Sequence, residues 1–483
     1  MNPRSNHSAL ELAPLSDEDL DRIHDQAMRI LSEVGTEVHD DEMLVRLGAA
    51  GQSIDGTRVR WDPEFIMAQL ALAPSTITVT GRNPERAFTL GDGSLVHTPV
   101  GGPPFAHDRE RGRRDGSLAD HIELVKMTHA SNVLPLVQSG VVEAQDLGYQ
   151  SRHLEMDYSI LRYTDRPLLI YGTAGPKARD GFTLASIVAG GVDKLIESPM
   201  TLSIVNPNSP LVWDGLMVDT LVACAEFNQP VAITPFLLAG ASAPVTLAAG
   251  LSLLIAETLA GVAMAQLIRP GTPCILGCFF NGVDMRSGGP SLGMPESVLT
   301  TLAGAQIAAR YGLPLRGGGG LCSAIALDAQ AAVESTMSMW ATYLAGCDLV
   351  VHSAGWLEGG LVASYEKFAI DLEIIAMFER LRGGLVVDDD SLAFDTIAEV
   401  GPGGLFLAHD HTLARFRDEV FMSPLFRSMA YPNWVKQGSP TADEVATGQW
   451  RKLLDSYVDP GIDDAIDAEL RDYVDRQTAI LEA

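Results

Sequence analysis

Residues 316–378 have the sequence RGGGGLCSAIALDAQAAVESTMSMWATYLAGCDLVVHSAGWLEGGLVASYEKFAIDLEIIAMF. This segment starts with glycines at the end of a short apolar run and continues into a helical pattern. A second short apolar run follows, and a second helical pattern comes after it. A short strand followed by a longer helix is the repeating unit of an α/β fold.

The same unit recurs along the chain from residue 95 onward. Strands are predicted at 95–99, 134–139, 168–172, 201–205, 231–234, 274–279, 313–317 and 349–352. Helices are predicted at 118–130, 152–163, 179–189, 211–227, 245–268, 295–311, 328–345 and 365–381. Eight such units predict a (β/α)8 TIM barrel. An open doubly wound sheet is the alternative, but the turn after the first strand, VGGPPF, has prolines where that fold has a fixed glycine-rich turn.

Two further segments flank the predicted barrel. Residues 1–93 combine a capped helix after Ser16 with short strand-like pieces, which predicts an N-terminal α+β cap. The barrel is expected to span 94–385. Residues 386–483 are expected to form a C-terminal helical appendage that packs on the barrel.

Composition limits the kinds of partner. The chain has 34 basic and 62 acidic residues, a formal charge of −28, which argues against nucleic acid and anionic membranes and favours a cationic small molecule. The N-terminus lacks a signal peptide pattern, and no uninterrupted apolar run is long enough to cross a bilayer, so a cytoplasmic location is predicted. The five cysteines are predicted to be reduced thiols. The apolar appendages favour a homo-oligomer.

Barrel enzymes place their chemistry where strands end, because those loops converge on one mouth. The predicted strand ends carry Gly101, Gln138, Ser139, Thr173, Asn206, Asn208, Thr234, Phe279, Asn281, Gly317, Gly318, Gly319, Gly320, His352 and Ser353. Rings such as Phe279 and Trp356 could be core packing, or they could form an aromatic cage for a quaternary ammonium group. The glycine run could bind phosphate through backbone amides or leave open space. Cys274 and Cys278 would lie about 13 Å apart on a strand, too far to share zinc.

Several motifs together resemble a known family. They are ILSEVG at 30–35, GMPE at 293–296, GGGG at 317–320, LDAQAAVEST at 327–336 and GWLEGGLVASYEKFAIDLEI at 355–374. From about residue 20 to 460 the chain resembles the trimethylamine methyltransferase superfamily, the MttB-like proteins. The resemblance implies a (β/α)8 barrel that moves a methyl group from an amine to cobalt in a separate corrinoid protein. Leu321 stands where the founding members carry pyrrolysine, which implies the branch that acts on quaternary amines.

For that branch, glycine betaine is the first expected substrate, with proline betaine, carnitine or γ-butyrobetaine as alternatives. The resemblance implies catalytic roles for His352, Glu334 and Glu358. It implies substrate contacts from Asn206, Phe279, His352, Trp356, Tyr365 and Glu366, and an approach route for the corrinoid along Gly317, Gly318, Gly319, Gly320 and Leu321. No tightly bound metal is expected. Arg316 and Arg162 are the candidates for binding a substrate carboxylate.

Two other functions remain open from the residues. One is a barrel lyase or aldolase that acts on a phosphorylated substrate through His352 and Glu358. The other is a quaternary-amine binding protein without catalytic activity. The sequence lacks the P-loop, nucleophile-elbow, HExxH and strand-linked GxGxxG motifs, which disfavours nucleotide, hydrolase, zincin and dinucleotide functions.

Overall fold

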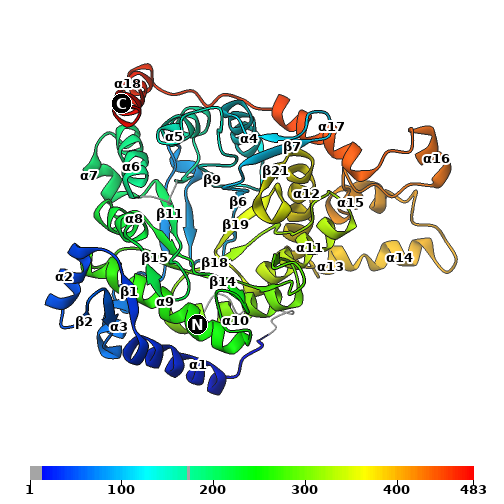
Figure 1. Cartoon of the computed structure of the whole chain (residues 1–483). Coiled ribbons are helices and arrows are strands. Elements are labelled where there is room, and N and C mark those ends of the chain that lie inside the picture. Colours follow the sequence, from blue (N-terminus) through cyan, green and yellow to red (C-terminus); the bar gives the residue numbers. More distant parts are fainter. Residues whose placement is uncertain (1–12, 171–174) are drawn as a thin grey trace.

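The computed structural model describes residues 13–170 and 175–483, and its centre is a barrel of eight parallel strands (Figure 1). The strands are β6 (Val96–Pro99), β9 (Val137–Gln138), β10 (Leu168–Leu169), β11 (Thr201–Val205), β13 (Val231–Ile233), β15 (Cys274–Gly277), β18 (Leu315–Gly318) and β19 (Leu349–Ala354). They pair in the order β6-β19-β18-β15-β13-β11-β10-β9. Between the two end strands, Thr98 Oγ1 donates to Gln138 Oε1 at 3.1 Å. The predicted (β/α)8 barrel is confirmed.

One helix follows each of the strands. The helices are α4 (Leu118–Ala130), α5 (Arg152–Tyr163), α6 (Gly175–Ala189), α8 (Gly215–Glu226), α9 (Leu247–Ile268), α10 (Pro295–Tyr311), α11 (Ala329–Ala345) and α12 (Tyr365–Arg382); a short α7 (Val192–Glu197) follows α6. Asp328 and Ser364 cap α11 and α12 by accepting backbone N–H groups. The helix predicted from residue 211 begins only at Gly215, because β12 (Val212–Trp213) pairs with a strand of the N-terminal segment and Asp214 caps the helix.

The N-terminal segment packs on one side of the barrel and on the amino-terminal end of its strands. Its elements are α1 (Asp17–Arg29), η2 (Ile30–Val34), β1 (Thr36–Val38), α2 (Asp41–Ala49), β2 (Ser53–Asp55), β3 (Arg58–Arg60), α3 (Pro63–Leu70), β4 (Ile77–Val79), η3 (Pro84–Arg86) and β5 (Phe88–Leu90). In the β4–β5 hairpin, Ile77, Val79 and Leu90 form one buried cluster with inward side chains of the barrel strands, such as Leu202 and Ile275. The hairpin therefore fills the amino-terminal end of the barrel.

Additional strands extend the barrel at its opposite, carboxyl-terminal end. One sheet contains β14 (Phe236–Ala239), β16 (Phe279–Val283) and β17 (Pro290–Ser291). Another contains β7 (Phe105–Asp108), β8 (Gly112–Asp115), β20 (Trp356–Leu357) and β21 (Val362–Ser364), with the short helix η4 (Glu358–Gly360) between the last two strands. These sheets form the walls of the barrel mouth.

Helix α9 is, among the described residues, the one helix long and apolar enough to cross a membrane. Most of it is inside the protein, since 83% of its most apolar window is buried. Glu257 in its centre is also buried, and its carboxylate accepts hydrogen bonds from Ser209 Oγ at 2.6 Å and Leu211 N at 2.7 Å. The α9 helix is therefore part of the core.

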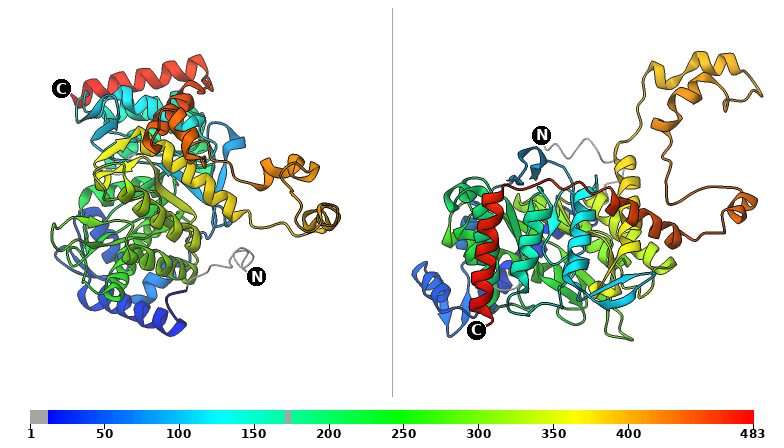
Figure 2. Two further views of the ribbon diagram at one scale, coloured as in Figure 1. Left: turned by 90° about the vertical axis from the view of Figure 1, so that its right-hand side faces the viewer. Right: turned by 90° about the horizontal axis from the view of Figure 1, so that it is seen from above.

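The C-terminal segment has two parts. Helices α17 (Ala442–Asp455) and α18 (Asp464–Leu481) pack on the barrel helices, α17 on α12 and α4 and α18 on α5 and α6. Helices α13 (Asp389–Leu392), α14 (Phe394–Val400), α15 (Asp410–Glu419) and α16 (Tyr431–Lys436) extend away from the barrel (Figure 2). The division at residues 93 and 385 stays a prediction.

Candidate functional site

A cavity of about 240 Å³ lies at the carboxyl ends of the barrel strands. Its described lining is Gly101, Gly102, Gln138, Ser139, Leu169, Ile170, Ile204, Asn206, Thr234, Phe236, Phe279, Arg316, His352 and Trp356. Most of these residues sit at or just beyond the end of a barrel strand, where parallel strands direct their loops to one mouth. Among them there is no Asp or Glu, so the described lining carries no negative charge.

Arg316 is the fixed positive charge of this lining. It belongs to β18, and only 2% of its surface is exposed. Nε and Nη1 of its guanidinium are buried and have no hydrogen-bond partner among the described residues. Burial lowers the pKa of Arg316 to about 10, so the side chain stays charged at neutral pH.

His352 faces the same cavity from β19. Its Nδ1 accepts a hydrogen bond from the backbone N–H of Gly101 at 3.2 Å, so in the neutral ring the proton is on Nε2. Burial and the nearby charge of Arg316 hold the pKa of His352 well below its ordinary value. The ring is therefore neutral at physiological pH, and Nε2–H is a donor that makes no hydrogen bond to the described residues.

Three aromatic side chains complete the walls. Phe236 and Phe279 are stacked with ring centroids 5.1 Å apart, and the Trp356 ring lies 4.4 Å from the ring of His352. Phe236 is 42% exposed, which places it at the opening of the cavity. The indole N–H of Trp356 is buried without a partner. Aromatic faces attract quaternary ammonium groups through the ring quadrupole, so this wall suits such a cation.

The polar residues of the lining are mostly held by other protein groups. Asn206 donates through Nδ2 to the Thr234 carbonyl at 2.7 Å, and Ser139 donates to Asp157 at 2.5 Å. Gln138 accepts from Thr98, as described above. The amide oxygen of Asn206 is left for other contacts, and Asn206 is exposed at the mouth.

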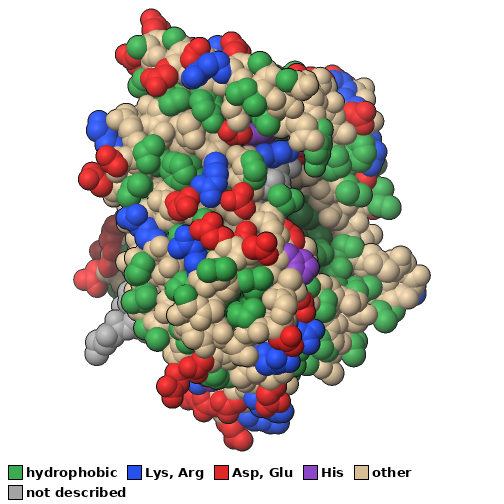
Figure 3. All heavy atoms as spheres, turned by 60° about the vertical axis from the view of Figure 1, so that its left-hand side comes forward, with side chains coloured by type: hydrophobic (Ala, Val, Ile, Leu, Met, Phe, Trp, Pro, Cys, Tyr) green, Lys and Arg blue, Asp and Glu red, His purple; other side chains and the backbone are tan. Residues whose placement is uncertain are grey.

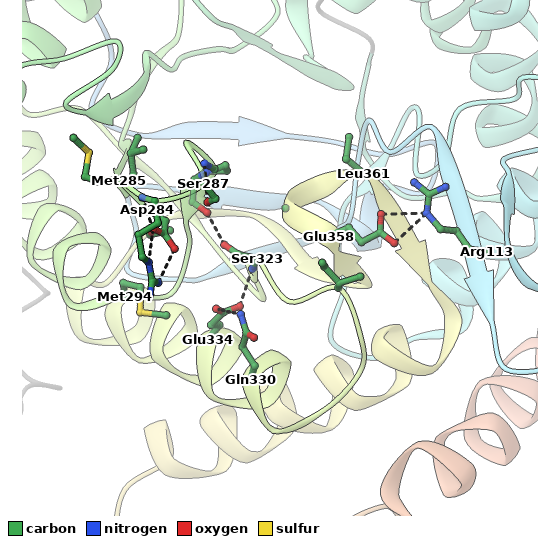
Figure 4. Close-up of a pocket in the computed structure, with 17 residues that line it drawn as sticks. Arg113, Asp284, Met285, Ser287, Met294, Ser323, Gln330, Glu334, Glu358 and Leu361 are labelled. Carbon is green, nitrogen blue, oxygen red and sulfur yellow. Dashed lines mark hydrogen bonds and ion pairs between the residues drawn. The ribbon is translucent and has the colours of Figure 1, made fainter.

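Glu334 and Glu358 lie in a second, larger groove of about 840 Å³ beside the mouth (Figure 4). Glu358 forms an ion pair with Arg113 at 3.0 Å. Glu334 accepts hydrogen bonds from the backbone N–H groups of Ser323 and Ala324, at 2.7 and 3.0 Å, and from Gln330. Neither carboxylate lines the cavity around Arg316. Trp356 does line that cavity, although it is close to Glu358 in the sequence.

Tyr365 and Glu366 also lie outside the cavity, under helix α17. The hydroxyl of Tyr365 donates to Glu123 at 2.7 Å and to Asp120 at 3.0 Å. Glu366 accepts from the Trp450 indole at 3.1 Å and from Thr447 at 2.9 Å. Tyr365 and Glu366 are the first two residues of α12, and both contact α17. They therefore lie outside the cavity around Arg316.

The glycine run is not an open floor. A Cβ atom on Gly317 would meet the Cys347 sulfur at 2.5 Å, and one on Gly319 would meet Ser353 at 2.4 Å. Leu321 packs against Gly318 and is buried. The glycines therefore allow close packing of β18 against its neighbours. The approach route for the corrinoid along Gly317, Gly318, Gly319, Gly320 and Leu321 stays a prediction.

About half of the residues that line the cavity are predicted from the ends of the strands. Gly101, Gln138, Ser139, Asn206, Thr234, Phe279 and His352 are both predicted strand-end residues and part of the cavity. Thr173 lies outside the described residues. Asn208 donates to Asp214, and Asn281 accepts from Ser297, both away from the cavity. Phe236 is missed because the extra strand β14 is not predicted, although the apolar run at 236–239 is its signal.

Of the two candidate arginines, the cavity contains Arg316. Arg162 lies on the outer helix α5, where it pairs with Asp459 at 2.9 Å. The space-filling view of one face shows acidic and basic side chains intermixed around a hollow with hydrophobic walls (Figure 3).

Comparisons with known proteins agree with this geometry. The family model for trimethylamine methyltransferase (MTTB) matches residues 2–481. The chain is 38% identical over 460 residues to a glycine betaine methyltransferase from Desulfitobacterium hafniense strain Y51, covering 95% of this chain and 96% of that one. It is 29% identical over 429 residues to a proline betaine:corrinoid methyltransferase from Eubacterium limosum, covering 86% and 87%.

A solved structure supports the fold. The monomethylamine methyltransferase of Methanosarcina barkeri superposes with a TM-score of 0.50 at 12% identity, covering 95% of this chain and 98% of that one. This likeness concerns the fold alone. The match of the family model over nearly the whole chain, and the 38% identity to a curated relative, confirm the resemblance found in the motifs. The chain belongs to the trimethylamine methyltransferase family.

Proposed function

We propose that this protein is a methyltransferase that moves a methyl group from a quaternary amine, with glycine betaine as first choice, to Co(I) of a separate corrinoid protein. The observation that carries the proposal is the small cavity at the barrel mouth, which has three aromatic rings and no acidic group in its described lining. The names of the relatives support it, since one acts on glycine betaine and another is a corrinoid methyltransferase for proline betaine.

The chemistry of a quaternary amine fits this lining. When the methyl group leaves, the C–N bonding electrons stay on nitrogen and give a neutral tertiary amine, while an electron pair of Co(I) forms the new Co–C bond. No proton has to be supplied to the leaving group. The protein therefore has to hold the nitrogen and its methyl group in line with the cobalt, which is catalysis by positioning.

The residues of the cavity can do this. Phe279 and Trp356 are buried and fixed, so their ring faces hold the ammonium group in one place. A neutral His352 adds a donor without adding a positive charge that would repel the cation. The opening beside Phe236 lets a second protein reach the methyl group. The cytoplasmic location and the absence of a tightly bound metal stay part of this proposal.

The lyase alternative loses its support in the structure. A phosphate site at the glycine run would need free backbone N–H groups, but Gly319 N donates to the Val351 carbonyl at 2.9 Å and the run is closely packed. Glu358, its acid or base, is paired with Arg113. Membership of a methyltransferase family points the same way.

The test is methyl transfer to cobalt under anaerobic, reducing conditions. The protein is mixed with cob(I)alamin and, in separate samples, glycine betaine, proline betaine, carnitine, γ-butyrobetaine, choline or trimethylamine. We expect the absorption spectrum of methylcobalamin to appear with glycine betaine and not with trimethylamine. The same samples are repeated with a corrinoid protein that accepts methyl groups from a betaine relative. If neither acceptor is methylated although glycine betaine binds, the protein is a binding protein and the proposal fails.

A further inference from the structure

The cavity contains a buried cation that the described protein does not neutralise. Arg316 is 2% exposed, and two of its guanidinium nitrogens have no partner. Its neighbours Cys278 and Cys347 are thiols whose pKa burial raises, so they stay neutral, and no carboxylate is among the groups that act on the pKa of Arg316. A buried charge without a counter-ion is costly to a fold. A buried cation without a counter-ion is typical of a site where the bound ligand supplies the negative charge.

The register of the strands shows which residues lie deep in the cavity and which lie at its opening. Arg316 is level with Gly277 of β15, whereas Phe236 is level with Phe279, two residues further toward the mouth. Two residues of an extended strand correspond to about 7 Å along the barrel axis. The backbone of Arg316 is therefore deeper than the stacked phenyl rings, and its guanidinium carbon lies 5.1 Å from the centroid of the Phe279 ring.

Two further donors surround the same space. Both His352 and Trp356 line the cavity. The indole N–H of Trp356 is buried without a partner among the described residues, and His352 uses its Nδ1 for Gly101, which leaves Nε2–H directed to other contacts. A carboxylate can accept from several donors at once, whereas a hydroxyl offers fewer and weaker contacts. The set of donors around the deep end is thus suited to an anion.

We infer that the cavity binds a zwitterion, a quaternary ammonium carboxylate, with its carboxylate on Arg316 at the deep end and its N-methyl groups against the aromatic rim. This orientation turns the methyl groups toward the opening, where an acceptor protein can reach them. Arg316 is then the residue that selects betaines over amines without a carboxylate. The inference deepens the proposed function and rests on it for the use of the bound molecule, although binding can be measured without any methyl acceptor.

The test is isothermal titration calorimetry with two ligands of similar size, glycine betaine and choline. Choline keeps the trimethylammonium group and has a hydroxymethyl group in place of the carboxylate. We expect wild-type protein to bind glycine betaine about 100-fold more tightly than choline, and R316M to lose about 100-fold in glycine betaine affinity while its choline affinity stays within a few-fold. R316K, which keeps the charge but not the planar fork, should lie between them.

The control variant is R46M, which removes an exposed arginine of α2 that pairs with Glu42 on the same helix. It should leave both affinities unchanged. Unchanged glycine betaine affinity in R316M would overturn the inference, as would equal affinities of wild-type protein for the two ligands. The ligand comparison on wild-type protein decides the matter even if R316M does not fold.

The two proposals can fail separately. If the wild-type protein shows the expected preference for glycine betaine but methylates no cobalamin or corrinoid protein, the proposed function fails and the carboxylate site stands. If R316M methylates cobalt from glycine betaine with unchanged KM, the carboxylate site fails and the proposed function stands.

Discussion

At the scale of single residues, His352 has an unusual backbone. Its φ angle is 64°, in the left-handed region that residues other than glycine adopt uncommonly and in which asparagine, aspartate and histidine are enriched. The pairing of β19 with β6 shifts its register between Val350 and Ala354, so the ladder is irregular at His352. Leu349 and Val351 point into the barrel core. If side chains alternated strictly along β19, His352 would point away from the interior of the barrel. The irregular pairing directs its side chain into the cavity instead.

This geometry makes His352→Asn an informative change. Asparagine tolerates the left-handed backbone, and its amide oxygen can accept from Gly101 as Nδ1 does, but it does not reach the position of Nε2–H. We expect glycine betaine affinity to fall about 10-fold, the usual cost of one hydrogen bond to a charged group, without loss of thermal stability. Calorimetry and thermal unfolding measure the two effects. Full affinity in the variant would show that Nε2 does not touch the ligand.

The low pKa of His352 also predicts a pH dependence. Because burial and Arg316 favour the neutral ring, His352 does not change charge between pH 8 and pH 6. Glycine betaine affinity should stay flat over this range, and it should change only where the pH approaches the lowered pKa. Calorimetric titrations at pH 6, 7 and 8 test this. A change that follows an ordinary histidine pKa and is absent in His352→Asn would contradict it.

At the scale of elements, Glu334 organises the loop between β18 and α11. Its carboxylate accepts from the backbone of Ser323 and Ala324, which closes a loop whose neighbour Cys322 is fully buried. A buried N–H group without an acceptor costs about 1–3 kcal/mol. These contacts give Glu334 a role in positioning the loop, and its predicted catalytic role stays a prediction.

We expect Glu334→Leu to lower the free energy of unfolding by about 2–4 kcal/mol, since the buried N–H of Ala324 and the partly buried N–H of Ser323 lose their acceptor. The matched variant Glu334→Gln keeps an oxygen for them and should stay close to wild type in stability and in kcat. Chemical denaturation and the cobalamin methylation assay measure these quantities. A large loss of kcat in Glu334→Gln at unchanged stability would support a catalytic role after all.

At the scale of the whole molecule, residues 384–440, called the arm here, extend for the most part away from the barrel (Figure 2), although Leu425 is buried. Their helices span 4 to 10 residues, too short to be stable without a packing partner. Apolar side chains along them are exposed, for example Phe394 at 76% and Leu405 and Leu407 at 73%. The arm starts after Arg382, which bonds to Gly93 before β6, at the end of the barrel opposite the cavity.

We expect the predicted homo-oligomer to cover the exposed apolar side chains of the arm with a second copy of this chain. A methyl-acceptor protein would have to approach the cavity at the other end of the barrel. Wild-type protein should have a mass of at least twice 51.7 kDa by light scattering, and the double change Leu405→Asp with Leu407→Asp should give monomers. Val45→Asp, on the exposed face of α2, is the control and should leave the mass unchanged. Monomeric wild-type protein at all concentrations would rule this expectation out.

Much of the architecture was readable from the amino-acid pattern. The period of the apolar residues marks each strand and helix of the barrel, because strand alternation and helix amphipathicity are local properties. Several helix bounds coincide with the structure, such as 118–130, 152–163 and 295–311. Strand ends also predict part of the cavity, since parallel strands bring their carboxyl ends together.

The roles of the acidic and aromatic residues after β19 depend on the tertiary structure. Trp356 lies in the cavity, Glu358 in the neighbouring groove and Tyr365 under α17, although they are close in sequence. An irregular strand pairing, a hairpin and a helix start send neighbouring side chains in different directions, and pairing across strands and helices decides each direction. The sequence thus determined the barrel and the family, whereas only the packing of distant segments decided that Arg316 lies buried and unpaired in the described cavity.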